Sequence, residues 1–269
     1  MRKTISIVAP FDPITKSELD ALRSFLTDQH YDFVFVYPSE EGILPIEVRK
    51  ELLKRVLKPY RKMGVNAPSG EVTSLTSVDE EALVHKGEFY RIAPGIHRFI
   101  LEKGYYLPQV VEANCSTHRA THSKSVAALC VELAKYHHVN PEKAYIAGML
   151  HDITKNKEDA YHQRILEKEK PEKLQLNHKV WHSYTARYWL KENMGLCDEE
   201  ILKAIDTHTI GDAKSKLGQI LYIADKCEPT RGYDAKKELS LAKKDLQAAA
   251  LLVLTEAKAY ILEKEGMHV

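Results

Sequence analysis

The chain lacks a large net charge and lacks long apolar segments. Its 269 residues carry 39 Lys and Arg against 38 Asp and Glu, a formal net charge of +1. A neutral chain has no general attraction to nucleic acid or to an anionic membrane surface, so we expect neither as a partner. No segment approaches the ~18 consecutive apolar residues of a membrane span, and the first residues do not resemble a signal peptide. We therefore expect a cytoplasmic protein.

Cysteine is scarce, and its spacing offers no obvious pairing. The four cysteines, Cys115, Cys130, Cys197 and Cys227, are widely separated and form no CxxC motif. This spacing predicts neither a disulfide framework nor a thiolate zinc site. Hydrophobic residues, at 44%, are by contrast abundant enough to build the core of one or two domains.

Histidine is the residue that stands out, and it is concentrated in one part of the chain. Nine of the 13 histidines lie between residues 118 and 208. This asymmetry indicates two functional halves. We place the boundary near Pro108, with domains at residues 1–108 and 109–269.

The first domain has a β-α-β pattern. Apolar, β-rich runs at 5–9 and 32–38 flank a helical segment at 17–30. A second helix is predicted over 47–63, begun by Pro45. A loop is predicted over 66–77, and helical segments at 80–106 break at Pro94–Gly95. The pattern predicts a small α/β domain.

The second domain is helical in pattern throughout. From Ser116 onward, short connections carry Asn140–Pro141, Gly195, Gly211 and Pro229, and no strand pattern is visible. A long amphipathic pattern covers residues 236–262. The sequence therefore predicts an all-α helical bundle.

Histidine and aspartate side chains recur within or at the end of apolar helical segments of this bundle. The adjacent pair His151–Asp152 follows the apolar run 144–150, and the others are His122, His182, His208 and Asp225. Imidazole and carboxylate are ligands that borderline and hard divalent metals share. Six such side chains on packed helices suit a two-metal site of the kind used in phosphate-ester hydrolysis.

Spacing alone leaves two alternatives open. His178 lies four residues before His182, and His118 lies four before His122, so each pair shares a helix face and competes for the same role. Asp225 would be an unpaired carboxylate in a buried helix unless a metal or a lysine meets it.

Several motifs of the second domain are similar to those of known proteins. The series His122, His151–Asp152 and Asp225 resembles the H…HD…D signature of the HD-domain superfamily of metal-dependent phosphohydrolases. His182 and His208 resemble the binuclear branch of that superfamily. The fuller motifs resemble the bacterial YqeK family and are Arg119–Ala–Thr–His122, His151–Asp152–Ile–Thr–Lys155, His182–Ser–Tyr–Thr–Ala186, His208–Thr–Ile–Gly211 and Ala224–Asp225–Lys226–Cys–Glu228–Pro229–Thr–Arg231.

The resemblance implies symmetric hydrolysis of diadenosine tetraphosphate to two ADP by a metal-bridging hydroxide, at a di-iron centre and within a homodimer. It implies that the metal ligands are His122, His151, Asp152, His182, His208 and Asp225. Asp152 is then the expected bridge and, with Lys155, a catalytic residue. Iron is implied by the family alone, because this donor set also suits manganese, cobalt, nickel or zinc.

The resemblance also implies which side chains meet the substrate. Lys155, Lys226 and Arg231 lie beside ligands and are expected to contact phosphate oxygens. Arg119 is expected either to bind phosphate or to form an ion pair with Glu228. Thr209 and Gly211 are expected in a loop that approaches the substrate, because glycine has no Cβ to obstruct it.

The stretch Ala9–Leu19 resembles the opening motif of nucleotidyltransferases such as nicotinate-nucleotide adenylyltransferase, with damaging departures. Ser17 and Glu18 replace the glycine and histidine that meet the triphosphate, and Pro10 replaces a glycine. The domain is also too short for that family. We therefore expect a degenerate nucleotidyltransferase-like domain without adenylyl transfer.

Two other activities are kept as alternatives. One is an HD phosphohydrolase or phosphodiesterase acting on another nucleotide. The other is a bifunctional enzyme that retains nicotinate-nucleotide adenylyltransferase activity.

Overall fold

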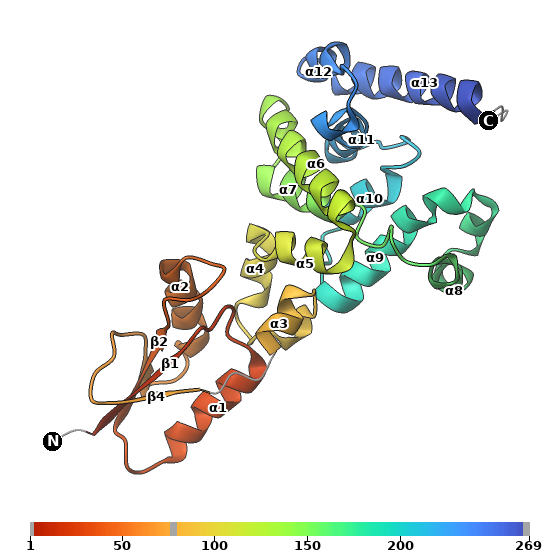
Figure 1. The fold of residues 1–269 in the computed structure, drawn as a ribbon. Helices are drawn as coiled ribbons and strands as arrows, with labels where there is room; N and C mark the ends of the chain where they lie inside the picture. Colours follow the sequence, from red (N-terminus) through yellow and green to blue (C-terminus); the bar gives the residue numbers. More distant parts are fainter. Residues whose placement is uncertain (1–2, 76–79, 266–269) are drawn as a thin grey trace. The chain divides into compact units, whose positions relative to one another are not determined.

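The computed structural model describes residues 3–75 and 80–265 of the chain. The chain divides into two compact units, Met1–Tyr106 and Leu107–Val269 (Figure 1). Pro108 lies in the first turn of helix α5 (Leu107–Asn114), where a proline costs no helical hydrogen bond. That helix begins the second unit and was not anticipated from the sequence.

The first unit is built on a parallel sheet, as the β-α-β pattern predicts. Its strands are β1 (Thr4–Ala9), β2 (Phe33–Pro38), β3 (Met63–Gly64) and β4 (Glu71–Ser74), in the order β3-β2-β1-β4. All three pairings are parallel. Helices α1 (Lys16–Thr27) and α2 (Ile46–Leu57) make the crossovers that parallel neighbours require. Ile5 and Ile7 of β1 are buried, which fits a central strand.

Two sequence predictions for this unit were wrong. The expected loop at 66–77 contains β4, an edge strand whose exposed residues give no apolar alternation. The second helix ends at Leu57 and not at residue 63, because Pro59 has no backbone N–H with which to continue the helical hydrogen bonds. The short strand β3 occupies part of that segment.

The rest of the first unit agrees with the predicted helical texture. It contains α3 (Glu80–His85), the short 3-10 helix η1 (Phe89–Arg91) and α4 (His97–Lys103). The predicted break at Pro94–Gly95 is present, and Gly95 adopts a φ of +93°, a conformation that favours glycine.

The second unit contains no strand among its described residues, which confirms the predicted all-α class. Its α-helices are α5, α6 (Thr117–Tyr136), α7 (Pro141–Leu150), α8 (Asp159–Glu169), α9 (Trp181–Met194), α10 (Glu199–Thr207), α11 (Lys216–Cys227), α12 (Lys236–Ala242) and α13 (Leu246–Glu265). The 3-10 helices are η2 (Pro171–Gln175), η3 (His178–Val180) and η4 (Pro229–Arg231). The pattern predicted over 236–262 is thus two helices, separated by residues 243–245.

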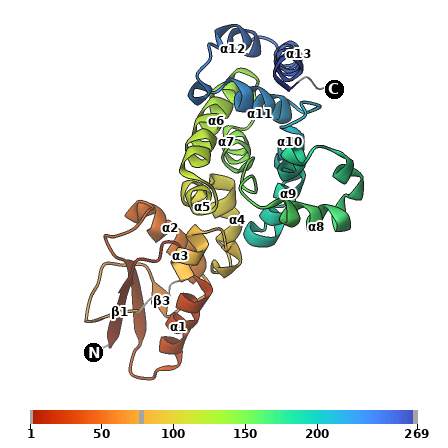
Figure 2. The same ribbon diagram turned by 45° about the vertical axis from the view of Figure 1, so that its right-hand side comes forward.

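Helices α6 and α7 lie side by side at the centre of this unit (Figure 2). Their approach depends on Gly148, since a Cβ there would lie 2.5 Å from the Cα of Ala127. Val126, Ala147 and Leu150 are buried around this contact. The two helices therefore form a closely packed base for the side chains that follow α7.

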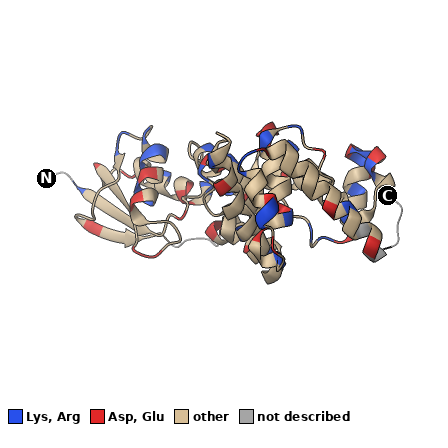
Figure 3. Ribbon diagram, turned by 90° about the horizontal axis from the view of Figure 1, so that it is seen from above, with Lys and Arg blue, Asp and Glu red and all other residues tan. Residues whose placement is uncertain are grey.

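Acidic and basic residues are interspersed along both units, in keeping with the near-zero net charge (Figure 3). Within the described part of the chain, no helix combines the length and the apolar character needed to cross a membrane. The four cysteines are free thiols, and Cys130 and Cys227 are buried.

Candidate metal centre

The six predicted metal ligands converge from the ends of neighbouring helices in the second unit. His122 lies near the start of α6 and His182 near the start of α9, while Asp225 lies near the end of α11. His151 and Asp152 directly follow α7, and His208 directly follows α10. All six side chains are buried.

Local sequence signals fix where these helices begin. Ser116 accepts a hydrogen bond from the backbone of Arg119 and so caps α6. Asn140 caps α7 with Pro141 in its first turn, and Asp198 caps α10. Because α7 and α10 start at fixed residues, the histidines that follow them are delivered at fixed positions.

Asp152 lies between two groups of histidines. Its Oδ1 is 3.1 Å from Nε2 of His182 and 3.4 Å from Nε2 of His208. Its Oδ2 is 3.5 Å from Nε2 of His151. Potential ligand atoms thus form two buried groups, one of His122, His151 and Asp152 and the other of Asp152, His182 and His208. The carboxylate common to both has the position of a bridge between two metal ions.

The hydrogen bonds of two histidines leave their Nε2 atoms ready for metal. Nδ1 of His151 lies 2.8 Å from the carbonyl of Gly148, and Nδ1 of His208 lies 2.7 Å from the carbonyl of Ile205. A carbonyl only accepts, so each Nδ1 carries the proton and each Nε2 presents a lone pair when the ring is neutral. Nε2 of His151 is buried and has no hydrogen-bond partner among the described residues. A buried orphan acceptor of this kind fits a metal ligand.

The protonation states of three of the predicted ligands also favour metal binding. Burial lowers the pKa of His151 to about 4 and that of His182 to about 4, so both rings are neutral at pH 7. Burial alone would raise the pKa of Asp152. The nearby histidines, above all His151, instead hold this pKa well below its usual range. Neutral imidazoles around an ionised carboxylate are the forms that bind divalent metals.

His122 is held from both sides by carboxylates. Its Nε2 lies 3.0 Å from Oδ1 of Asp225, and its Nδ1 lies 2.9 Å from Oε1 of Glu228. Burial opposes ionisation of Glu228, but hydrogen bonds from Thr230, Ser125 and His122 outweigh it and lower its pKa. An ionised partner at Nδ1 orients a ligating histidine and strengthens it as a ligand. Glu228 was missed as a functional residue, although it belongs to the motif quoted around Asp225.

Two cations contact the buried carboxylate of Asp225. Nζ of Lys226 lies 2.7 Å from Oδ2, and Nη2 of Arg231 lies 2.8 Å from Oδ1. Burial by itself would raise the pKa of Asp225, but Lys226 and His122 hold it well below its usual range. A partner lysine is therefore present, which is one of the two partners, a metal or a lysine, that the buried position of this carboxylate predicted.

Arg119 and Lys155 also contact the cluster. Nη1 of Arg119 donates to Oδ2 of Asp152 at 2.7 Å, so the ion pair with Glu228 that we considered is not formed. Nζ of Lys155 lies 3.0 Å from Nδ1 of His182 and donates to the carbonyl of Lys179. Burial lowers the pKa of Lys155. Both cations thus border the predicted ligands.

A threonine and histidine network lies beneath His182 and was not anticipated. The Thr154 hydroxyl donates to the carbonyl of His182 at 3.0 Å and lies 3.3 Å from the Thr185 hydroxyl. Nδ1 of His162 contacts that same Thr185 hydroxyl at 2.8 Å. These buried groups fix the first turn of α9, where His182 is located. Their residue types are too common for sequence alone to have singled them out.

The loop after His208 has a structural constraint of its own. Gly211 adopts a φ of +73°, and a Cβ there would lie 2.6 Å from the ring of Tyr222. Thr209 is half-buried, and its hydroxyl lies 3.1 Å from that of Ser183. Glycine is therefore required at 211 by the backbone and by the Tyr222 ring. The expected contacts of Thr209 and Gly211 with substrate stay predictions.

The two competing histidines lie outside the buried groups. His178 is exposed and pairs with Asp159 at 2.8 Å. His118 is also exposed, one turn before His122. Geometry thus selects His122 and His182 over the rivals that share their helix faces.

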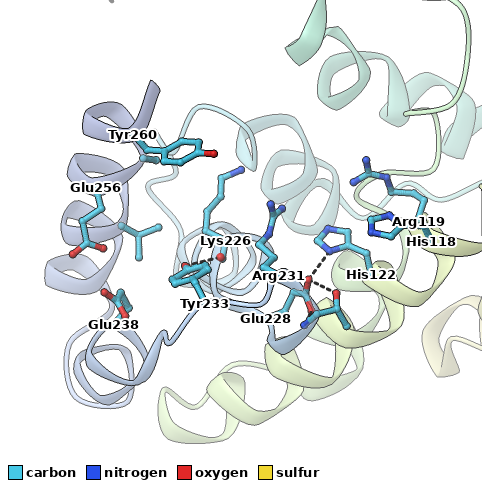
Figure 4. A pocket seen from close by; sticks show the side chains of 13 residues that line it. His118, Arg119, His122, Lys226, Glu228, Arg231, Tyr233, Glu238, Glu256 and Tyr260 are labelled. Carbon is cyan, nitrogen blue, oxygen red and sulfur yellow. Dashed lines mark hydrogen bonds and ion pairs between the residues drawn. The ribbon is translucent and has the colours of Figure 1, made fainter. Parts of the chain in front are cut away.

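A cavity of about 900 Å³ opens beside His122 (Figure 4). Its wall on this side carries Arg119, Lys226 and Arg231, and its other walls come from the segment after η4, from α12 and from α13. Positive charge is therefore gathered where the cavity meets the predicted ligands.

Part of the nucleotidyltransferase-like stretch Ala9–Leu19 forms a hydrogen-bonded cap at the start of helix α1. Oε2 of Glu18 accepts from the backbone of Thr15 at 2.8 Å, and the Thr15 hydroxyl accepts from the backbone of Glu18. This capping box covers the start of α1, where the related transferases are expected to hold phosphate. The carboxylate of Asp12, in the same stretch, is also engaged within the unit, because it accepts a hydrogen bond from the Tyr106 hydroxyl at 2.7 Å.

Glu18 also makes the stability of the first unit depend on pH. Burial and then the nearby Glu81 raise the pKa of Glu18 from 4.5 to about 7. Its contribution to stability is complete below pH 4.5 and is lost as the pH rises through 7. At pH 8, the α1 amides are therefore expected to be better protected against hydrogen exchange in Glu18→Gln than in the wild type. This difference between variant and wild type should be smaller at pH 5.

The measurement compares variant and wild type at each pH, so that the intrinsic exchange rates cancel. Glu47→Gln, on the exposed face of α2, is the matched control, and its difference from the wild type should change little with pH. An equal difference between Glu18→Gln and wild type at both pH values would contradict the assigned role of Glu18.

Comparisons with known proteins identify the family to which this part of the chain is similar. Residues 119–230 match the HD domain family. The chain is 30% identical over 158 residues to a symmetrical bis(5'-nucleosyl)-tetraphosphatase of Bacillus subtilis, covering 57% of this chain and 85% of that protein.

Two further similarities cover comparable shares of the chain. It is 32% identical over 179 residues to a probable nicotinate-nucleotide adenylyltransferase/Ap4A hydrolase of Mycoplasma pneumoniae, covering 62% of this chain and 51% of that protein. A crystal structure of a predicted HD superfamily hydrolase involved in NAD metabolism, from Clostridium acetobutylicum, superimposes with a TM-score of 0.56 at 30% identity. That superposition covers 61% of this chain and 89% of the other.

Proposed function

Because this chain belongs to the HD-domain hydrolases of the YqeK family, we propose that it hydrolyses a dinucleoside tetraphosphate, diadenosine tetraphosphate, to two molecules of ADP. The observation that carries the proposal is the carboxylate of Asp152 between two groups of buried histidines. A carboxylate shared in this way suits a pair of divalent metals, and paired metals are typical of phosphate-ester hydrolysis.

The residues that would hold the metals divide into two sets around Asp152. His122, His151 and Asp225 lie on one side, and His182 and His208 lie on the other. When bound, two metal ions activate water and neutralise charge on the phosphoryl group. Iron is the metal we propose, on the basis of the family. The donor set, imidazole and carboxylate without thiolate, is compatible with it.

The chain's own cations supply the rest of the electrostatics. Lys226 and Arg231 lie beside Asp225 and border the cavity, so phosphate oxygens that enter the cavity meet both. Arg119 borders the same cavity and touches Asp152. Lys155 is placed at His182, on the other side of Asp152. Cations fixed at these positions stabilise negative charge as it develops during phosphoryl transfer.

Product analysis tests the reaction directly. Purified full-length protein is incubated with diadenosine tetraphosphate and Fe²⁺ or Mn²⁺, and nucleotides are separated by chromatography. We expect ADP as the sole product, because only a central cut gives equal halves. Chelation of the metal should stop the formation of ADP.

Other products would contradict the proposal. ATP with AMP would show an asymmetric cut. Bound metal without turnover would reject this substrate and direct attention to other nucleotides. We also propose a homodimer, which sedimentation of the same sample would test.

A further inference from the structure

The cavity beside His122 is larger than the phosphate groups require. Its volume of about 900 Å³ is at the upper end of the roughly 300–1,000 Å³ that small-molecule sites enclose. Its far walls are formed by residues after 230, beyond the match to the HD domain. Tyr233 follows η4, Glu238 lies on α12, and Tyr260 lies on α13. These elements add a compartment to the metal centre.

The charges of the cavity are separated along its length. Figure 4 shows Arg119 and Arg231 on the side of His122, whereas Glu238 and Glu256 lie at the opposite side. A diphosphate is attracted to the first side and repelled from the second. The acidic side therefore suits a group that offers hydrogen-bond donors.

Glu238 is a buried carboxylate with an unused oxygen. It is 6% exposed, and its Oε2 has no hydrogen-bond partner among the described residues. Leaving such an acceptor unsatisfied is costly, so a donor from a bound molecule fits it well. Glu238 also lines the cavity, but its Oε2 is itself covered, so the side chain must turn for a molecule bound there to reach this oxygen.

Two tyrosines offer ring surface between these ends. Tyr233 is 50% exposed and Tyr260 is 62% exposed, and in Figure 4 both project toward the space beside Lys226. The ring of Tyr233 is anchored, because its hydroxyl donates to the carbonyl of Lys226 at 2.6 Å. Anchored and exposed aromatic rings are the usual surfaces on which nucleobases stack.

We propose that this cavity is the nucleoside half-site, in which Tyr233 and Tyr260 contact the base and Glu238 accepts a hydrogen bond from the ribose hydroxyls or from an exocyclic amine. The diphosphate of the same ligand then lies against Lys226 and Arg231, which adjoin both the cavity and Asp225. This inference rests on the proposed function. It adds the residues that select a nucleoside over a bare phosphate ester.

Binding to the metal-loaded, full-length protein tests the half-site without requiring turnover. Calorimetry compares ADP with methyl diphosphate, which has the same ester linkage without the nucleoside. ADP should bind the wild type about tenfold more tightly or better, the scale that stacking on an aromatic ring provides. Tyr260→Ala and Glu238→Leu should each reduce this ratio at least threefold, and neither should change the affinity for methyl diphosphate.

A matched control separates this effect from general loss of an exposed tyrosine. Tyr136 is 53% exposed, lies at the end of α6 and does not line the cavity. Tyr136→Ala should therefore leave the ratio at its wild-type value. Because Tyr260 is also exposed, its variant is expected to fold even if the buried Glu238→Leu does not.

Two analogues identify the donor that meets Glu238. 2',3'-Dideoxy-ADP lacks the ribose hydroxyls, and IDP lacks the exocyclic amine. The analogue that lacks the true donor should bind wild type and Glu238→Leu equally, while the other should still distinguish them. Either result supports the half-site, and an undiminished difference with both analogues would exclude Glu238 from nucleoside binding.

The failures of the two proposals are distinguishable. Equal affinity of the wild type for ADP and methyl diphosphate would overturn the half-site even if diadenosine tetraphosphate is cleaved. Tight, Tyr260-dependent binding of ADP without cleavage would keep the half-site and overturn the reaction.

Discussion

Asp152→Asn is expected to abolish metal binding at one or both of the two positions and to reduce kcat by about a thousandfold or more, since paired metals contribute several kcal/mol to the transition state. Oδ1 faces His182 and His208, while Oδ2 faces His151 and Arg119. An amide has a similar shape, but it is neutral and offers one acceptor oxygen in place of two. It can therefore serve one of the two groups at most.

The measurements are metal content and turnover of diadenosine tetraphosphate on the same sample. Asp206→Asn is the matched control, because Asp206 is also buried and ion-paired, 3.1 Å from Lys170, but lies outside the cluster. It should retain metal and activity. An Asp152→Asn protein with the full complement of metal and wild-type turnover would disprove the bridging role.

Gly148→Ala is expected to lower the free energy of unfolding of the helical unit by about 1–3 kcal/mol, the range found when well-packed cores are overfilled. The added Cβ would lie 2.5 Å from the Cα and 2.9 Å from the backbone nitrogen of Ala127. Backbone atoms cannot rotate away, so α6 and α7 must separate. Helix propensity alone predicts the opposite sign, a gain of about 1 kcal/mol.

The sign of the change therefore decides between the two effects. Urea unfolding followed by the fluorescence of Trp181 and Trp189, both on α9, reports on this unit. Lys135→Ala, at an exposed position of α6, should change the free energy by less than about 0.5 kcal/mol. A stabilised Gly148→Ala protein would show that the contact between α6 and α7 is looser than described.

The predictable part of the site is the part with a local sequence signal. His151 and Asp152 are recognisable because an apolar run delivers them to one point, and motif order adds His122, His182, His208 and Asp225. The role of Glu228 was not predictable in this way, because its contact with His122 joins residues 106 positions apart. Sequence reasoning considered Arg119 as its partner, whereas Arg119 reaches Asp152.

The same limit applies to the fold. Strands β1 and β2 have apolar runs and were predicted, but β4 is recognisable only through its pairing with β1. Glu238 and Tyr260 likewise carry no pattern that marks them in the sequence. Their proposed role is visible only in the folded structure, where α12 and α13 form one side of the cavity.

The predicted ligands are distributed over or directly after α6, α7, α9, α10 and α11. This distribution links the stability of the native chain to the supply of metal. A metal held by such dispersed residues binds the native chain and has no comparable site in the unfolded one. Each tenfold excess of free metal over its dissociation constant then adds about 1.4 kcal/mol to native stability by mass action. Metal scarcity would accordingly act on abundance as well as on turnover, because a chain without metal opens more often and is exposed longer to proteases.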